Sequence, residues 1–187
     1  MKKRKSDRRP ESQISGATRL TEIVVLVPGA AEILSAYGLH CVSCVWRTGE
    51  TLEEGCLAHG SSAEMTAELL DDLNRALAKA SARKETIEVT PAAVAGLRAI
   101  ALQEKRSGQG LAVIVDEGGS FCLEFRAAPE AGDRAFVFKG KPPVSVFVSP
   151  LVLRRIGGAV IDARDGGFKL DLPEDADLAA PGSIGCI

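Results

Sequence analysis

The residues best suited to chemistry in this sequence are its cysteines. Cys41 and Cys44 are three positions apart, a spacing that suits a reversible disulfide or half of a tetrathiolate metal site. The remaining thiols are Cys56, Cys122 and Cys186, which makes five in the chain. An odd number argues against a framework of structural disulfides and favours metal binding or redox work.

Cys41 and Cys44 can act as a redox dithiol. A protonated His40 would stabilise a thiolate beside it, and Arg47 is also close in the sequence. An accessible thiolate can attack a disulfide or bind iron. On this interpretation the pair carries out thiol exchange.

Zinc binding is the alternative for the same region. Cys41, Cys44, Cys56 and His59 have the types and spacing of a four-ligand zinc set. Cys56 and His59 share a face of a predicted helix because they are three residues apart. Cys56 also fits the apolar side of that helix beside Leu52, and we expect it to be a core residue.

Composition narrows the possible partners. The chain has 187 residues, of which 45% are hydrophobic, 26% charged and 4% aromatic, with a net charge of -2. Low aromatic content and a net charge near zero predict no nucleic-acid partner. No apolar run approaches the roughly 20 residues of a membrane span, and no apolar segment follows the basic N-terminus at signal-peptide distance. We therefore expect no membrane contact and a cytoplasmic location, with residues 1–19 as a disordered basic tail.

Residues 20–80 are predicted to form a small all-helical domain. One helix is expected over 28–38, ending at Gly38. A second is expected over 50–59, ending before Gly60. A third begins at the capping-box pair Ser61 and Glu64. Its apolar face has helical spacing: Met65, Leu69, Leu70, Leu73 and Leu77.

After a short polar linker over 81–86, residues 87–187 have a different pattern. Thr90 can cap a helix with Pro91 in its first turn, and a second short helix is expected over 150–156. Short β-rich runs separated by glycine, proline and aspartate are 111–115, 121–125, 135–138, 144–148, 160–163 and 168–172. The sequence therefore predicts an α+β fold whose second domain is β-rich, mostly antiparallel and has two short helices.

Residues 87–187 resemble the A-type iron–sulfur cluster carriers, the HesB/IscA-like family. The matching pieces are Ile87-Glu88-Val89-Thr90, Gly118-Gly119 before Cys122, Ser149-Pro150-Leu151, Ile161-Asp162 and Gly167-Phe168-Lys169-Leu170. The resemblance implies that Cys122 and Cys186 hold iron or a cluster (2Fe-2S or 4Fe-4S). The family typically has a third cysteine, and Ile184 stands in its place here.

The resemblance also implies partners. Clusters usually take four thiolates, which two copies of Cys122 and Cys186 in a homodimer would supply. A cluster scaffold and apo iron–sulfur client proteins are the other expected partners.

The segment from Ile23 to Leu77 resembles a small helical redox-disulfide domain, the type associated with hybrid cluster protein. The residues that carry this resemblance are chiefly Tyr37-Gly38-Leu39-His40-Cys41-Val42-Ser43-Cys44. It implies a dithiol that cycles with a disulfide or touches a metal.

The combined interpretation is a cluster carrier or assembly factor with an N-terminal dithiol that assists redox exchange or transfer. We expect no enzyme in the ordinary sense, because no nucleophile–base–acid set is recognisable. Two alternatives from other classes stay open. One is a thiol–disulfide oxidoreductase on a degenerate carrier scaffold, and the other is a zinc-stabilised interaction module.

Overall fold

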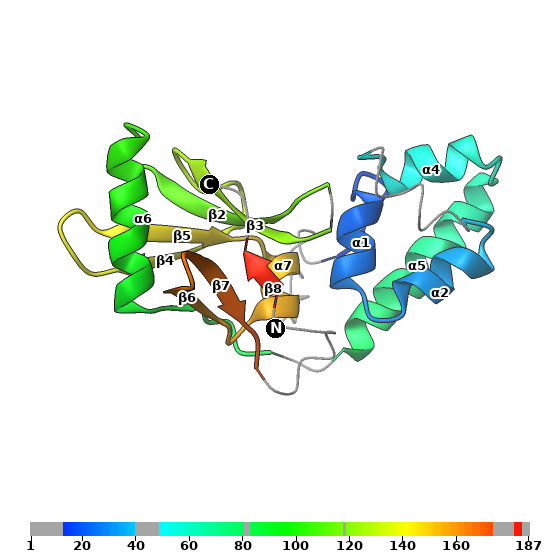
Figure 1. The fold of residues 1–187 in the computed structure, drawn as a ribbon. Coiled ribbons are helices and arrows are strands. Elements are labelled where there is room, and N and C mark those ends of the chain that lie inside the picture. The colour runs from blue at the N-terminus through cyan, green and yellow to red at the C-terminus, as the bar shows by residue number, and fades with distance from the viewer. Residues whose placement is uncertain (1–12, 40–48, 81–82, 118, 174–181, 185–187) are drawn as a thin grey trace, which may run out of the picture.

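The chain folds into a helical unit and a β-rich unit that lie side by side (Figure 1). The computed structural model describes residues 13–39, 49–80, 83–117, 119–173 and 182–184. Within these ranges, no helix has both the length and the apolar character needed to cross a bilayer.

In its described residues, the first unit has the helices α1 (Leu20–Leu26), α2 (Ala30–Ala36), α4 (Leu52–Ala58) and α5 (Ala63–Lys79). Thr51 caps α4 in a full capping box with Glu54. Their shared core is apolar and consists of Ile14, Leu20, Ile23, Val27, Ala30, Leu34, Leu39, Leu52, Cys56, Leu69, Leu73 and Leu77.

The helices differ from the predicted ones at three places. The residue that caps α5 is Ser62, whose side chain accepts a hydrogen bond of 3.2 Å from the backbone N–H of Met65. The predicted cap, Ser61, instead donates its backbone N–H to the carbonyl oxygen of Cys56. A separate first helix, α1, was not predicted, and α2 begins at Ala30 rather than at residue 28.

The β-rich unit contains two four-stranded sheets. One has the order β3-β2-β5-β4 and the other β1-β6-β7-β8. The strands are β1 (Glu88–Val89), β2 (Gly110–Val115), β3 (Phe121–Arg126), β4 (Arg134–Phe138), β5 (Val144–Val148), β6 (Val160–Arg164), β7 (Gly167–Asp171) and β8 (Gly182–Ile184). The helices are α6 (Pro91–Gln103) and α7 (Pro150–Ile156).

The α+β class predicted from the sequence is confirmed, but both sheets are mixed. β2 pairs with β5 in parallel, and β1 pairs with β6 in parallel, while the other pairs are antiparallel. The predicted cap Thr90 is present: its side chain accepts from the N–H of Ala93 at 3.2 Å at the start of α6.

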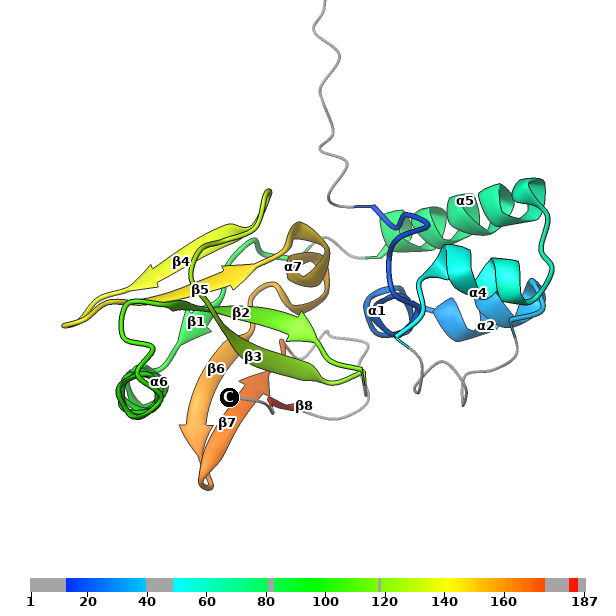
Figure 2. The same ribbon diagram turned by 90° about the horizontal axis from the view of Figure 1, so that it is seen from above.

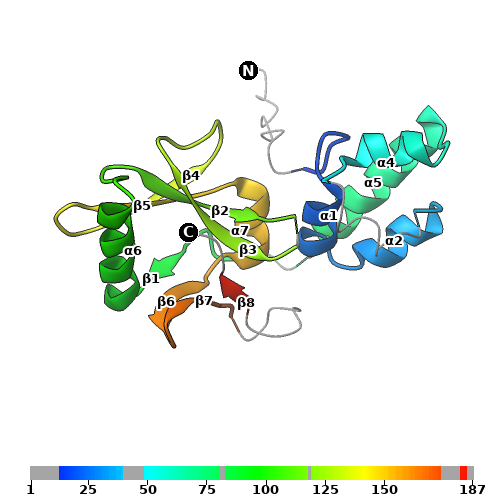
Figure 3. The same cartoon turned by 45° about the horizontal axis from the view of Figure 1, so that its top comes forward.

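The core of the β-rich unit lies between its two sheets and its helices. Leu123, Val146, Ile161 and Leu170 are fully buried there. The same core includes Leu26 of α1, and α1 contacts both β2 and α7. Figures 2 and 3 both place α1 beside the end of the β2–β3 hairpin, so the two units share a packed boundary.

Candidate functional site

Cys122 lies in the β2–β3 hairpin, close to its turn. It is the second residue of β3 and lies opposite Ile114 of β2. Its neighbours Phe121 and Leu123 belong to the main core of the β-rich unit, whereas Cys122 does not. Because side chains alternate along a strand, the thiol faces the opposite side of the sheet from that core.

The Cys122 thiol is almost completely buried. Its side chain is 3% exposed, and Sγ donates a hydrogen bond of 3.8 Å to the carbonyl oxygen of Leu123. It nevertheless lines a pocket of about 440 Å³ that runs along β3. A ligand that filled this pocket would therefore meet the thiol.

The pocket that Cys122 lines has charged walls. Two arginines line it, Arg19 at the start of α1 and Arg106 after α6. Four acidic residues also line it: Glu104, Asp116, Glu117 and Glu124. The guanidinium of Arg106 lies 5.5 Å from the ring centroid of Phe125, a cation–π contact. Among the described residues, no carboxylate forms an ion pair with Arg19 or Arg106.

The C-terminal tail returns to the strand that carries Cys122. β8 pairs antiparallel with β7, with Ile184 opposite Phe168, and β8 also contacts β3. Cys186 follows Ile184 by two positions and lies outside the described residues, as do Cys41 and Cys44. The predicted pairing of Cys122 with Cys186 therefore stays a prediction.

The segment with Cys41 and Cys44 rejoins the described chain next to this pocket. Gly49 is the first described residue after it. A Cβ atom at Gly49 would lie 3.9 Å from Oε1 of Glu117, a wall residue of the Cys122 pocket. From there the chain is tied to α1, because the N–H of Leu20 donates to the carbonyl oxygen of Glu50 at 2.9 Å.

Cys56 and His59 lie in different environments. Cys56 is 2% exposed and packs in the core of the helical unit with Leu52, as expected for a core thiol. His59 is the exposed C-cap residue of α4. Among the residues that the structure covers, no group of three or more histidine, cysteine and acidic side chains is placed to hold a metal ion.

Arg19 and Arg106 were not among the residues predicted from the sequence. Neither belongs to a motif, and each reaches the pocket only because α1 and the end of α6 pack near β3. A local pattern in the sequence carries no signal for such a position, since the contact joins segments far apart in the chain.

Comparison with known proteins gives structural matches only. No protein-family model matches the chain, and no curated protein matches it. The crystal structure of Escherichia coli SufA, involved in the biosynthesis of iron–sulfur clusters, matches 52% of this chain and 93% of its own with 24% identity and a TM-score of 0.39. The crystal structure of IscA with a [2Fe-2S] cluster matches 47% of this chain and 86% of its own, with 19% identity and a TM-score of 0.35.

Proposed function

We propose that the protein binds an iron–sulfur cluster, or iron, and delivers it during cluster biogenesis. Cys122 and Cys186 are the proposed ligands, in agreement with the sequence resemblance of residues 87–187 to A-type carriers. The observation that supports this most is the contact of β8 with β3. Two residues span at most about 7 Å, so the tail beyond Ile184 begins close to the strand of Cys122.

The proposed site combines a fixed ligand with one near the chain end. Cys122 is fixed because β2 pairs with β3 along its length, and Cys186 is the penultimate residue of the sequence. The guanidinium groups of Arg19 and Arg106, which have no ion pair within the described residues, would offset part of the negative charge of a thiolate-ligated cluster.

One chain provides two of the four thiolates that a 2Fe-2S or 4Fe-4S cluster usually takes. The loaded form is therefore proposed to be a homodimer, with each copy contributing Cys122 and Cys186. A cluster scaffold would load it in the cytoplasm, and apo iron–sulfur proteins would receive the cargo.

Cys41 and Cys44 are proposed to assist as a dithiol. The position of Gly49 beside Glu117 supports this role, because it brings the end of their segment to the pocket of Cys122. The dithiol would accept the cluster during hand-over or keep the cluster ligands reduced.

Anaerobic reconstitution with iron and sulfide tests the carrier function. We expect thiolate-to-iron charge-transfer bands in the wild type, loss of most of their intensity in Cys122→Ser and in Cys186→Ser, and a dimer on size-exclusion chromatography of the loaded protein. Cys56→Ser is the matched control, because Cys56 packs in the other core. A wild type without these bands, or bands as strong in Cys122→Ser as in Cys56→Ser, would contradict the proposal.

A second preparation tests the dithiol and the zinc alternative. Redox titration with mass-tagged alkylation should give one disulfide between Cys41 and Cys44, and Cys41→Ser should slow transfer of the cluster to an apo-ferredoxin without removing the bands. Metal analysis of the untreated protein should give no stoichiometric zinc. One zinc per chain that is lost in Cys56→Ser would favour the zinc set instead.

A further inference from the structure

Strand β4 forms one edge of its sheet. The strand order is β3-β2-β5-β4, and within the described part of the chain β4 pairs with β5 only. Figure 2 shows β4 at the outside of the β-rich unit, beyond β5. An edge strand presents a row of backbone N–H and C=O groups that can pair with a strand of another chain.

The side chains of β4 leave apolar surface in water. Val137 is 65% exposed, and Ala135 is also exposed. Because side chains alternate along a strand, these two lie on the same face of the sheet. Phe136 and Phe138 lie on the other face, where they pack against the core. Val137 is thus a large apolar side chain at an open edge.

β4 lacks three features that commonly protect an edge strand, namely a proline, a bulge and an unpaired charge. Its five residues pair with β5 in one continuous register, and the sequence from Arg134 to Phe138 contains no proline. The one charged residue is Arg134, which forms an ion pair with Glu85. The edge is therefore suited to pairing with a further strand.

The chain that leads into β4 has an excess of negative charge. Glu130 and Asp133 precede the strand and lie 3.1 Å and 3.9 Å from the guanidinium nitrogens of Arg126. Glu124 lies 3.7 Å from the same guanidinium group. Three carboxylates thus share one cation, and their negative charge is only partly offset.

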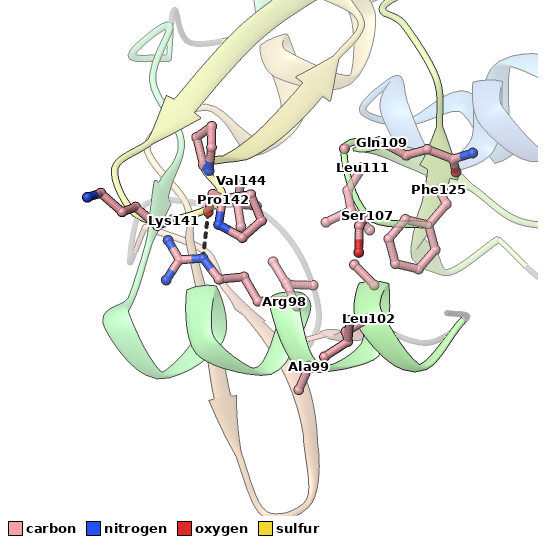
Figure 4. A pocket seen from close by; sticks show the side chains of 14 residues that line it. Arg98, Ala99, Leu102, Ser107, Gln109, Leu111, Phe125, Lys141, Pro142 and Val144 are labelled. Carbon is pink, nitrogen blue, oxygen red and sulfur yellow. Dashed lines mark hydrogen bonds between the residues drawn. The ribbon is translucent and has the colours of Figure 1, made fainter. Parts of the chain in front are cut away.

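The loop that follows β4 has only positive charge. Lys139 and Lys141 lie in this loop, and residues 139–143 contain no acidic residue. Arg98 holds the loop in place, because its Nε donates to the carbonyl oxygen of Pro142 at 2.7 Å and its Nη2 donates to that of Lys139 at 3.1 Å. Figure 4 shows the Lys141 side chain directed away from α6. β4 therefore runs from an acidic end to a basic end.

We propose that β4 is the docking surface for a second copy of this chain, with the two β4 strands paired antiparallel. In the register centred on Phe136, Val137 lies opposite the partner's Ala135, so both exposed apolar pairs leave water. The basic end of each strand then faces the acidic end of the other, which favours this orientation. The contact is isologous, since the same residues serve both copies.

This assembly is distinct from the dimer proposed to hold a cluster. Cys122 is on β3, at the opposite edge of the same sheet. Seven strand spacings of about 4.8 Å, or about 34 Å, would separate the two β3 strands. The two Cys122 thiols could not share one cluster across β4, so the inference goes beyond the proposed function and does not depend on it.

Sedimentation velocity of the reduced, metal-free full chain tests the proposal. We expect a dimer with a dissociation constant of about 100 μM or tighter. Val137→Lys should weaken association at least about tenfold, because it places a charge opposite the partner's Ala135. The matched control is Leu57→Lys, which changes an equally exposed apolar residue on α4. A wild type that stays monomeric at 100 μM, or equal association of the two variants, would overturn the proposal.

Two further measurements test the strand and its orientation. Amide hydrogen exchange within residues 134–138 should slow as the protein concentration rises, and exchange that is independent of concentration would exclude β4 as the interface. Raising the salt concentration from about 0.05 M to about 0.5 M should weaken association, because it screens the attraction between the acidic and basic ends. Association that strengthens in salt would contradict the antiparallel orientation, since parallel strands would bring like charges together.

Discussion

Arg154 of α7 donates a hydrogen bond of 2.8 Å from Nη2 to the carbonyl oxygen of Leu77 in the last turn of α5. The carbonyl groups of a final helical turn have no partner within the helix, so this bond satisfies one of them across the boundary between the two units. Arg154→Ala should lower the free energy of unfolding by about 1 kcal/mol. Urea denaturation measures this, and hydrogen exchange should become faster near the end of α5.

The control for this variant is Arg75→Ala, which removes an exposed ion pair with Asp72 within one helix. We expect this change to stay within about 0.5 kcal/mol. If the two variants lose equal stability, the contact between the units contributes nothing specific.

Leu123→Ala should be strongly destabilising because Leu123 is fully buried between the sheets. The loss expected for a buried leucine is about 2–5 kcal/mol. Leu57→Ala, at a side chain that is 77% exposed, should change stability by less than about 0.5 kcal/mol. Thermal unfolding of the two variants beside the wild type distinguishes them, and similar melting temperatures would contradict the assigned core.

Gly110→Ala should destabilise β2, because the added Cβ would overlap the ring of Phe147 on β5. Overpacking of this kind costs about 1–3 kcal/mol. The cost should be smaller in a Phe147→Leu background, which a double-mutant cycle in urea measures. Gly167→Ala is the control, since nothing lies within 4 Å of a Cβ at that position. Equal costs in both backgrounds would exclude the overlap as the cause.

Asp171 should contribute to stability in a pH-dependent way. A hydrogen bond from Arg164, 2.6 Å from Nη1 to Oδ2, lowers the pKa of this carboxyl in the folded state. The contribution is therefore complete above the unfolded-state pKa of about 4 and is lost as the pH falls through the lowered folded-state pKa. The difference in urea midpoint between wild type and Asp171→Asn should narrow from about pH 6 to about pH 3.

This pair is exposed to solvent, so the difference at neutral pH should be small and should shrink in salt. A difference that grows toward acid pH would contradict the assigned direction of the pKa shift.

Local signals in the sequence predicted the local elements. Thr90 followed by Pro91 marks the start of α6 because capping and a fixed φ act within one turn, and the structure has this helix. Asp165 and Gly166 separate the predicted strands 160–163 and 168–172, and both have positive φ, 54° and 75°, which aspartate and glycine tolerate in a turn. Ser61 was predicted as the cap of α5 in place of Ser62 because the two adjacent serines have the same side chain.

Non-local contacts decided the elements and positions that were missed. β8 has three residues, and its pairing with β7 depends on a partner far back in the chain. The sequence of β2 or of β5 alone contains no signal that the two strands pair in parallel. For the candidate site, Cys122 could be placed on a strand from the sequence, but its pocket with Arg19 and Arg106 requires the packing of α1 and α6 against that strand.

The core of the two sheets also includes a side chain from outside residues 87–187, Leu26 of α1. A truncated protein that begins at residue 83 would lack this leucine and would expose the apolar hollow that it fills beside α7. Such a fragment should be more prone to aggregation than the full chain. The sheets are therefore expected to depend on α1 for their solubility when the protein is expressed.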